Sequence, residues 1–450
     1  MKYIFHLGRV PALSVAEIQT IFKKVKVNFS IDLISSKFLI LDIKNKINPD
    51  DLLVEIGGII KIARVLGEYE NPDEALKKTI SAIEELNKRR SSKKIIGYSI
   101  YFTQNKEKDK VLEISEKIRN NFSNAKKLRS KDLNLRIVFP GKNMELNSAS
   151  VFKNKIIKKG MEFNFLFLPA CSMPPLTPPK RGRTSVPRRE EIVPPLLGES
   201  RWDTENKIIL SKTVAVQDIE SYSERDYDRP KRNPKIGIIP PKLAQIMINL
   251  AQIKKGEVLL DPFCGIGTIL QEALLNDYKV VGSDANGDQI ANCKENLEWL
   301  SKKYILKYPD YKIFQSDMKN ITRKIKPNSI DAIVTESTLG PIYKKVPNKA
   351  EIGHNYNRFI KMYTGFFQIA KLILRKNKRI IITIPAYKTK NGGYATAPFI
   401  DRLEKIGYSV ISPLDREFII EDIKTTDRNS IIYDRPNQIV AREVLIFKNK

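Results

Sequence analysis

An eight-residue segment, Asp261 to Thr268, constrains the fold of this chain more than any other part of its sequence. It has the sequence DPFCGIGT and lies between an apolar run, Val258 to Leu260, and a helical pattern that begins at Thr268. Its glycines permit a tight turn and a close approach of the backbone to a ligand. Free N–H groups at the start of the following helix favour an anionic group there. The segment therefore predicts a strand, a ligand-binding turn and a helix.

Strand and helix patterns alternate from residue 240 to residue 450. This alternation predicts right-handed crossovers, a mostly parallel sheet and an α/β, Rossmann-like domain. The last apolar run, 438–447, predicts an edge strand that returns antiparallel. The other expected strands are 258–260, 279–283, 312–315, 330–334 and 379–384, and the expected helices are 268–275, 288–300 and 356–374.

Two acidic residues follow later strands of this domain. Asp284 ends the second strand, 23 residues after Asp261, where a carboxylate can accept both ribose hydroxyls of a nucleoside cofactor. Asp317 follows the third strand, where its carboxylate could reach an adenine amine. The alternative is a helix cap and two surface acids. The arrangement favours a nucleoside-cofactor site at the carboxyl edge of the sheet.

Two smaller units are expected in front of this domain. Residues 1–60 have an α+β pattern, with a capping box of Ser14 and Glu17 at a helix start and a buried strand at 38–41. Residues 61–168 alternate strand and helix patterns. The expected strands there are 95–102, 135–139 and 162–168, and the expected helices are 72–88, 111–121 and 148–158.

The second unit is strongly basic. From Lys88 to Gly160 there are 20 Lys and Arg against 6 Asp and Glu, which is half of the chain's net charge of +28. These side chains form either solvated faces or a surface for phosphate groups, and their concentration in one unit favours phosphate. The excess over the whole chain, 79 Lys and Arg against 51 Asp and Glu, favours a nucleic-acid partner. A generally Lys-rich proteome is the alternative.

A proline-rich segment, 169–205, has no hydrophobic period and predicts a disordered or extended insertion. No function is expected of it, although its arginines could touch RNA nonspecifically. Residues 206–239 are expected to be a linker, within which a regular pattern resumes at Lys207 to Leu210.

The cysteine and hydropathy patterns bear on the compartment. Cys171, Cys264 and Cys293 are far apart and the chain has two histidines, so no metal site is expected and a reducing compartment is favoured. The first residues lack the pattern of a signal peptide, and no run of 18 apolar residues occurs. These features predict a cytoplasmic protein without a membrane span.

Several motifs resemble those of one family. DPFCGIGT looks like the cofactor loop of class I S-adenosylmethionine-dependent methyltransferases, in the variant of RNA methylases. The segments 225–230 (RDYDRP) and 237–244 (GIIPPKLA) are similar to the lead-in of THUMP-domain tRNA guanosine methylases, which methylate the 2-amino group of a guanosine at position ten. LGRVPALS at 7–14 resembles their N-terminal domain, and ELNSAS at 145–150, with Lys153 to Lys155, resembles the end of their THUMP module.

This resemblance implies a class I methyltransferase domain at 240–450, preceded by a ferredoxin-like domain at 1–60 and a THUMP-like RNA-binding domain at 61–168. It implies S-adenosylmethionine as cofactor and tRNA as partner. By position, Asp284 would hold the ribose, Asp317 the adenine, and Asp261 the methionine end. The full set of implied cofactor residues is Pro240, Asp261, Pro262, Phe263, Cys264, Gly265, Gly267, Thr268, Asp284 and Asp317.

The chain departs from the family at the catalytic motif. Where the family carries DPPY after the fourth strand, this chain has Glu336, Ser337, Thr338, Leu339, Gly340 and Pro341. In DPPY, acceptors bond the hydrogens of the base amine and favour a nucleophilic nitrogen, and an aromatic ring stacks on the extruded base. Glu336 could replace the aspartate; Leu339 cannot stack, but Tyr343 could. The alternative is an ordinary loop. No cysteine lies here, which disfavours covalent attack on cytosine.

Four functions follow as hypotheses. The first is methylation of the 2-amino group of a tRNA guanosine, and the second is the same scaffold on another RNA base. The third is a catalytically silent tRNA-binding protein, and a DNA amino-methyltransferase is the weakest. A late segment, from Tyr433 to Glu443, also resembles the family, and its arginines either contact phosphate or pair within the fold, with pairing favoured. The sequence does not give the oligomeric state.

Overall fold

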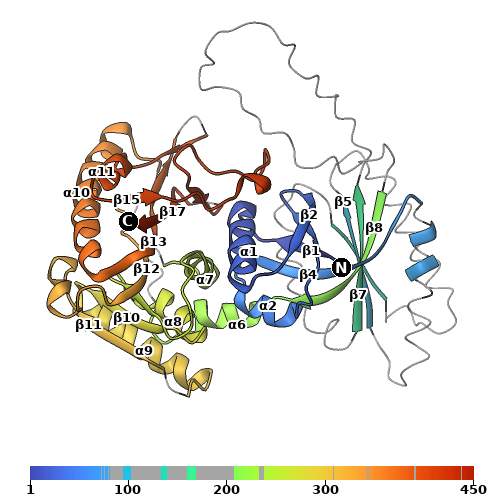
Figure 1. The fold of residues 1–450 in the computed structure, drawn as a ribbon, viewed down its shortest axis with the longest axis horizontal. Helices are drawn as coiled ribbons and strands as arrows, with labels where there is room; N and C mark the ends of the chain where they lie inside the picture. The colour runs from blue at the N-terminus through green and yellow to red at the C-terminus, as the bar shows by residue number, and fades with distance from the viewer. Residues whose placement is uncertain are drawn as a thin grey trace, which may run out of the picture.

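The computed structural model describes residues 1–81 except 72, 76 and 80, and residues 207–450 except 233–237, 308, 342, 344, 390–391 and 437. Between these ranges it describes three strands, 95–102, 133–138 and 160–168, with the side chains of 163–166. The expected helices at 111–121 and 148–158, the basic side chains of 88–160 and the proline-rich segment 169–205 lie outside the described residues, and the expected helix at 72–88 is described only as far as residue 81. The described elements form two sheets, one in each half of the molecule (Figure 1).

The C-terminal sheet has the strand order β11-β10-β9-β12-β13-β17-β15. Strands β9 to β13 run parallel, and β17 runs antiparallel to both β13 and β15. An antiparallel last strand inserted between two strands of the opposite direction, here β13 and β15, is the arrangement of the class I methyltransferase fold that the resemblance implied. The strands are β9 (Val258–Asp261), β10 (Lys279–Asp284), β11 (Tyr311–Gln315), β12 (Ile330–Glu336), β13 (Leu374–Lys388), β14 (Tyr394–Ala395), β15 (Tyr408–Val410), β16 (Ile431–Tyr433) and β17 (Val440–Asn449).

The expectation that the last strand lies at the edge is wrong. β17 pairs with β13 on one side and with β15 and β16 on the other. β15 is three residues long, too short to show a strand period in the sequence. The interior position explains why nearly every residue of β17 is buried.

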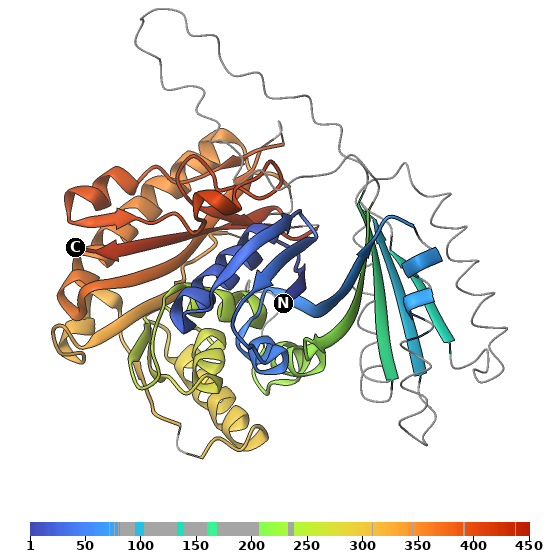
Figure 2. The ribbon, with the colours of Figure 1, turned by 45° about the vertical axis from the view of Figure 1, so that its right-hand side comes forward.

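Helices cover both faces of this sheet (Figure 2). Leu259 of β9 and Ile381 of β13 pack toward one helical layer, whereas their neighbours Leu260 and Ile382 pack toward the other. Burial on both faces explains the continuous apolar runs of these strands. The first layer holds α7 (Pro241–Leu250), α8 (Thr268–Leu275) and α9 (Gly287–Lys303), and the second holds η4 (Met318–Arg323), α10 (Lys349–Ile373) and α11 (Ile400–Lys405).

The N-terminal sheet has the strand order β2-β3-β1-β4-β8-β7-β5-β6. Its pairs are antiparallel, except that β5 runs parallel to β6 and β7. Because β4 spans residues 59–69, it crosses the boundary expected at residue 60. The elements are β1 (Lys2–Leu7), α1 (Pro11–Val25), β2 (Phe29–Ile34), β3 (Phe38–Ile43), α2 (Pro49–Glu55), β4 (Ile59–Tyr69), β5 (Ile95–Phe102), β6 (Leu133–Val138), β7 (Gly160–Leu168) and β8 (Lys207–Val216).

The segment expected to be a linker, 206–239, begins with a strand of this sheet. β8 lies between β4 and β7, and its burial pattern shows that it is part of the sheet's core. Short helical turns follow it: α6 (Ile219–Ser223) and the π-helical turn η3 (Glu224–Asp228). The apolar period that resumes at Lys207 was therefore the signal of a strand.

The capping box expected at Ser14 and Glu17 does not form. Helix α1 begins one turn earlier, at Pro11, whose fixed φ suits a first helical position. The Ser14 hydroxyl instead donates to the Gly58 carbonyl (2.7 Å) and accepts from the Gly8 N–H (3.1 Å). The Glu17 carboxylate accepts from the N–H groups of Gly57 (2.9 Å) and Gly58 (2.7 Å).

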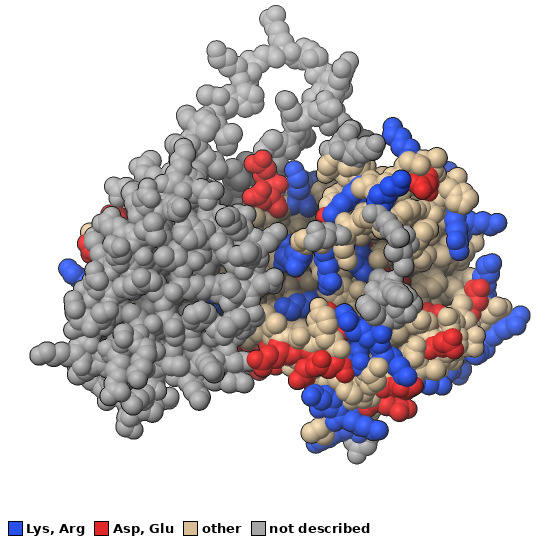
Figure 3. All heavy atoms as spheres, turned by 180° about the vertical axis from the view of Figure 1, so that it is seen from behind, with Lys and Arg blue, Asp and Glu red and all other residues tan. Residues whose placement is uncertain are grey.

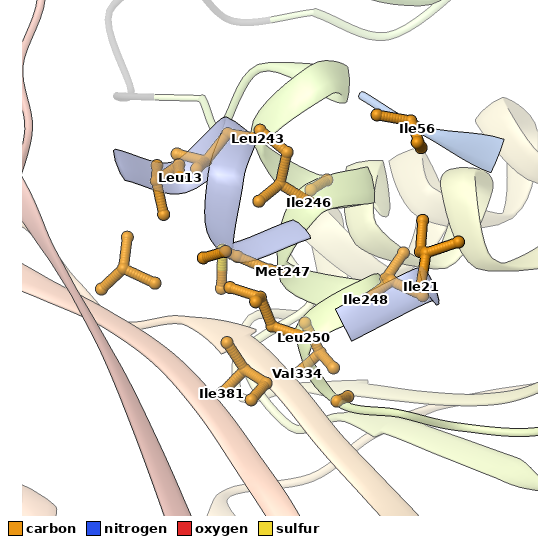
Figure 4. Packing of buried hydrophobic residues seen from close by; sticks show 14 of the residues in the cluster. Leu13, Ile21, Ile56, Leu243, Ile246, Met247, Ile248, Leu250, Val334 and Ile381 are labelled. Carbon is orange, nitrogen blue, oxygen red and sulfur yellow. The ribbon is translucent and has the colours of Figure 1, made fainter. Parts of the chain in front are cut away.

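The two halves share one hydrophobic core. Leu13 and Ile21 of α1 pack with Leu243 and Met247 of α7, and the cluster continues to Ile381 in the C-terminal sheet (Figure 4). Polar contacts border this core: the Asn249 amide donates to Glu17 (2.6 Å), and the Gln19 amide donates to the Pro413 carbonyl (2.6 Å). The N-terminal unit therefore packs against the C-terminal domain through α1 and α7.

Candidate active site

Acidic residues gather where the parallel strands end. Asp261 ends β9, Asp284 ends β10 and Glu336 ends β12. Asp317 comes two residues after β11. Because the carboxyl ends of parallel strands meet at the same edge, the fold brings together the acids that the sequence singled out.

The glycine loop has the shape that its sequence predicted. Gly265 and Gly267 have φ of 48° and 87°, in the left-handed region that glycine adopts without strain. A Cβ at Gly267 would lie 2.6 Å from the Cys293 sulfur, whereas a Cβ at Gly265 would meet no atom within 4 Å. Helix α8 then begins at Thr268 without a side-chain cap. Gly265 is thus a point where a ligand can approach the backbone closely.

The other residues of the loop tie it to the sheet. The Cys264 N–H donates to the Ser283 carbonyl of β10 (3.0 Å), and the Ser283 hydroxyl donates to the Pro262 carbonyl (3.4 Å). The Phe263 ring lies 5.6 Å, centroid to centroid, from the ring of Phe366 in α10. These contacts hold the loop between β10 and α10.

The Asp261 carboxylate is buried beneath the loop. It accepts from the Thr335 hydroxyl of β12 (2.6 Å) and from the Phe263 N–H (3.2 Å). Burial, and to a smaller extent the nearby carboxylates of Asp284 and Glu336, raise the pKa of this carboxyl to about 7, although its two hydrogen bonds act in the opposite direction. Asp261 therefore gains or loses a proton near neutral pH, and a bound cation would favour its ionised form.

Asp284 and Asp317 differ in what they contact. The half-buried Asp284 carboxylate accepts from the N–H groups of Gly265 (3.1 Å) and Asn286 (2.9 Å), so it joins β10 to the glycine loop. Asp317 is exposed and caps η4 by accepting from the Lys319 N–H (2.9 Å). The sequence offered a surface acid as the alternative for Asp317, and its exposure agrees with that, while the cap of η4 was not foreseen. Contact of Asp317 with adenine stays a prediction.

A lead-in segment, residues 225–232 and 238–240, runs from η3 to the start of α7. The Arg225 guanidinium binds both carboxylate oxygens of Glu272 in α8, at 2.6 and 3.1 Å. The buried Arg229 donates to the Thr268 hydroxyl (2.6 Å). Pro240 is buried and occupies the N-cap position of α7, without a side-chain hydrogen bond to the helix. Sequence reasoning missed the Arg225–Glu272 pair, although a glutamate within the apolar helix pattern of α8 was a signal for a buried cation nearby.

The loop after β12, residues 336–341, rests on aromatic side chains. The Ser337 N–H donates to the Thr383 carbonyl (3.0 Å), and its hydroxyl lies 2.8 Å from the Tyr363 hydroxyl. Gly340 has φ of 85°, and a Cβ there would lie 2.8 Å from the Tyr387 hydroxyl. Contacts with β13 and α10 therefore shape this loop in place of the two prolines of the family motif.

The remaining loop residues have more open surroundings. Thr338 is exposed and accepts from the Gly340 N–H (3.2 Å) through its hydroxyl. Leu339 is half-buried and Pro341 is exposed. Tyr343 is half-buried, lies edge-on to Tyr387 with centroids 5.9 Å apart, and accepts from the Asn355 amide. Stacking of Tyr343 on a base stays a prediction.

Glu336 is held by an arginine from the last strand. The Arg442 Nε donates to Glu336 Oε1 (2.5 Å), and Nη2 lies 3.5 Å from Oε2. The sequence left two roles open for the late arginines, contact with phosphate or pairing within the fold, and Arg442 is paired within the fold. The identity of the partner was beyond the sequence, because the two residues are more than 100 positions apart.

The described residues contain neither a metal-binding cluster nor a membrane-spanning helix. In the described part of the chain, no cluster of three or more His, Cys, Asp or Glu side chains is placed to bind a metal ion. Of the helices described, none combines the length and hydropathy that a bilayer-spanning segment needs.

Seen from behind, the described surface of the C-terminal half carries basic and acidic side chains interspersed (Figure 3).

Comparison with known proteins gives matches to methyltransferases. A model of RMKL-like methyltransferase domains matches residues 229–392, and a DNA methylase model matches residues 85–295. The crystal structure of TrmN from Thermus thermophilus is 11% identical, with 100% of each chain covered and a TM-score of 0.49.

Proteins related to this chain by sequence have names that state an RNA and a base. The tRNA (guanine(10)-N2)-dimethyltransferase of Methanothermobacter thermautotrophicus is 32% identical over 183 residues, 40% of this chain and 48% of that protein. The U6 snRNA (guanine-N(2))-methyltransferase THUMPD2 of Bos taurus is 33% identical over 104 residues, 23% of this chain and 19% of that protein. The chain therefore spans less than half the length of either relative.

A further relative is matched over most of its length. The probable tRNA (guanine(10)-N2)-dimethyltransferase of Methanothermococcus thermolithotrophicus is 32% identical over 121 residues, which are 27% of this chain and 74% of that protein. Together with the methyltransferase-domain match over 229–392, this likeness identifies the chain as a member of the RNA guanine-N2 methyltransferase family.

Proposed function

We propose that this protein transfers a methyl group from S-adenosylmethionine to the exocyclic 2-amino group of a tRNA guanosine. One observation carries the proposal: the glycine loop with Asp261 and Asp284 lies at the same sheet edge as Glu336 and its loop. Relatives named as tRNA (guanine(10)-N2)-dimethyltransferases support the choice of base and RNA.

The cofactor side fits S-adenosylmethionine in charge and shape. The cofactor supplies a methyl group on a cationic sulfonium and carries an α-ammonium group. Open space beside Gly265 admits it against the backbone, and the buried Asp261 carboxylate offers a partner for its positive charge. Asp284 would bind the ribose hydroxyls while it keeps the glycine loop in place.

The base side offers an acceptor for the amine. Glu336 is mostly buried, but 13% of its side chain remains exposed at the sheet edge. A carboxylate that bonds the amine hydrogens would favour a pyramidal nitrogen, whose lone pair can attack the methyl group. Because the transfer is an in-line displacement, correct placement of the nitrogen supplies much of the rate.

The basic stretch 88–160 is the proposed surface for tRNA, and tRNA as substrate makes the cytoplasm the proposed location. Binding should then weaken steeply with salt, because each phosphate that is neutralised releases counterions. An affinity for tRNA that stays constant between low and moderate salt would contradict this part of the proposal.

A second RNA is the favoured alternative substrate. It is motivated by the relatives named as U6 snRNA (guanine-N(2))-methyltransferases and by the altered loop at Glu336 to Pro341. The cofactor chemistry and the target amine would be the same, so only the RNA would differ.

The test is methyl transfer from labelled S-adenosylmethionine to unmodified tRNA transcripts, followed by nucleoside mass spectrometry and fragment mapping. The proposal expects N2-methylated guanosine at one position, and no transfer by the Glu336→Ala variant. Methylation of a spliceosomal RNA but not of tRNA would favour the alternative. No transfer to any RNA, with cofactor binding intact, would contradict both and favour a silent RNA-binding protein.

A further inference from the structure

Arg442 is a charged side chain buried in the interior of the C-terminal sheet. Its side chain is 1% exposed, in a strand whose other residues are almost all buried. Burying an ion pair costs desolvation energy that an apolar pair of similar size avoids. A buried arginine at this position therefore calls for a reason beyond stability.

The contacts of Arg442 join three separate segments of the chain. The guanidinium reaches from β17 to the Glu336 carboxylate at the end of β12, with Nε at 2.5 Å from Oε1. Its Nη2 also donates to the Ile238 carbonyl (3.3 Å), two residues before the buried Pro240. One side chain thus links the proposed amine acceptor to the lead-in segment beside the proposed cofactor site.

Glutamate needs such a contact more than aspartate does. Its side chain is one methylene longer and has one more rotatable bond, so its carboxylate is less well defined at the end of a strand. Here the guanidinium holds the carboxylate on one side, and the Thr383 hydroxyl lies 3.4 Å from Oε1 on another. A carboxylate has about four acceptor positions, so these contacts leave room for an amine.

The charges around the site point the same way. Asp261, Asp284 and Glu336 are close enough that the last two raise the pKa of the Asp261 carboxyl. Arg442 brings a cation to this group from the side of β17. Because the guanidinium is 1% exposed, it would act on substrate through Glu336 and not by contact.

We propose that Arg442 is a positioning residue for methyl transfer: it fixes the Glu336 carboxylate toward the base amine and couples it, through Ile238, to the lead-in segment. This inference rests on the proposed function. Arginine suits the role better than lysine, since its planar fork can bind the carboxylate and the carbonyl at once.

The variants are Arg442→Met, Arg442→Lys, Glu336→Gln and the double variant Glu336→Gln/Arg442→Met. The matched control is Glu443→Gln. Glu443 is the next residue of β17, is buried and is also ion-paired, with Arg428 at 3.4 Å. Removing one partner of a buried ion pair can destabilise the fold. The double variant leaves no unpaired buried charge, so its activity can be measured even if a single variant fails to fold.

The readouts are kcat, the KM for tRNA and the affinity for S-adenosylhomocysteine. Arg442→Met should lower kcat by about 100-fold, as expected for a misplacement of about 1 Å, with cofactor affinity unchanged. The kcat of Arg442→Lys should lie between those of the parent and Arg442→Met, and the kcat of Glu443→Gln should equal that of the parent. In the Glu336→Gln background, Arg442→Met should lower kcat no further. An equal loss of kcat in both backgrounds, or full activity of Arg442→Met, would overturn the inference.

A second measurement does not depend on activity. Hydrogen exchange should become faster in Arg442→Met at both 336–341 and 238–243, and stay unchanged at both in Glu443→Gln. Unchanged exchange at both segments in Arg442→Met would overturn the coupling. If the unaltered protein transfers no methyl group, the proposed function fails, and hydrogen exchange still decides whether Arg442 holds the two segments.

Discussion

The two sides of the active-site edge are shaped by contacts of different range. On the cofactor side, the turn at Gly265 and Gly267 follows from backbone conformations that these residues allow locally. On the base side, the loop from Glu336 to Pro341 takes its form from side chains of β13, α10 and β17. A glycine motif can therefore be recognised within a short stretch of sequence, whereas a loop that has lost its prolines depends on residues far along the chain.

The largest expected effect is on the cofactor side. Gly267→Val should abolish cofactor binding, because its Cβ would lie 2.6 Å from the Cys293 sulfur at φ of 87°. Gly256→Val is the matched control: its φ is 82°, but a Cβ there meets no atom within 4 Å. The control should lose only the 1–2 kcal/mol or so of a left-handed residue in stability. Calorimetric titration with S-adenosylhomocysteine measures the difference, and equal binding by both variants would contradict the local account.

On the base side, Gly340→Ala should lower methyl transfer by about 10- to 100-fold and leave cofactor binding intact. The added Cβ would lie 2.8 Å from the Tyr387 hydroxyl, so the loop must shift. Tyr387→Phe removes that hydroxyl and should restore part of the rate in the double variant. Single-turnover transfer to tRNA checks this, and a loss of cofactor affinity in Gly340→Ala would contradict the separation of the two sides.

The next effect is a pH dependence carried by Asp261. Its pKa of about 7 means that the carboxyl is protonated below neutral pH and ionised above it. Cofactor affinity should therefore rise with pH through 7, by about tenfold per pH unit below that value. Asp261→Asn should bind more weakly and show a flat profile between pH 6 and 8. A parent profile that is equally flat would contradict the role of this carboxylate.

The same pKa has a consequence for stability. Because the folded-state pKa lies above that of the unfolded chain, protonation favours the folded state, and ionisation of Asp261 destabilises it. The stabilisation that comes from the protonated carboxyl is fully present below about pH 4 and is lost as pH rises to about 7. The free energy of unfolding of Asp261→Asn, relative to the parent, should therefore increase across that range. An unchanged difference between the two proteins would show that Asp261 is not the group responsible.

The smallest effect concerns the Ser337 hydroxyl. Ser337→Ala removes its 2.8 Å contact with the Tyr363 hydroxyl and should cost about 1 kcal/mol of stability. Tyr363→Phe should cost a similar amount, and the double variant little more, since each breaks the same bond. Urea unfolding measures all three. Additive losses would mean that the contact does not hold the loop.

The sequence predicted the parallel sheet and the glycine loop because their signals are periodic and local. It mispredicted the edge strand because β15 is too short to show a period, and the capping box because Pro11 starts α1 a turn earlier. It took the strand β8 for a linker. The partners of Glu336 and Ser337 lie on other elements, so no spacing in the sequence indicates them.

The central claim is that the site methylates the 2-amino group of a guanine. Inosine lacks that amine and otherwise keeps the purine, so it isolates the reacting atom. The decisive measurement is methyl transfer from labelled S-adenosylmethionine to a tRNA that carries guanosine or inosine at the mapped position. We expect transfer to guanosine and none to inosine, with equal binding of both RNAs. Equal transfer to the two RNAs would contradict the account, because the methyl group would then go to another atom.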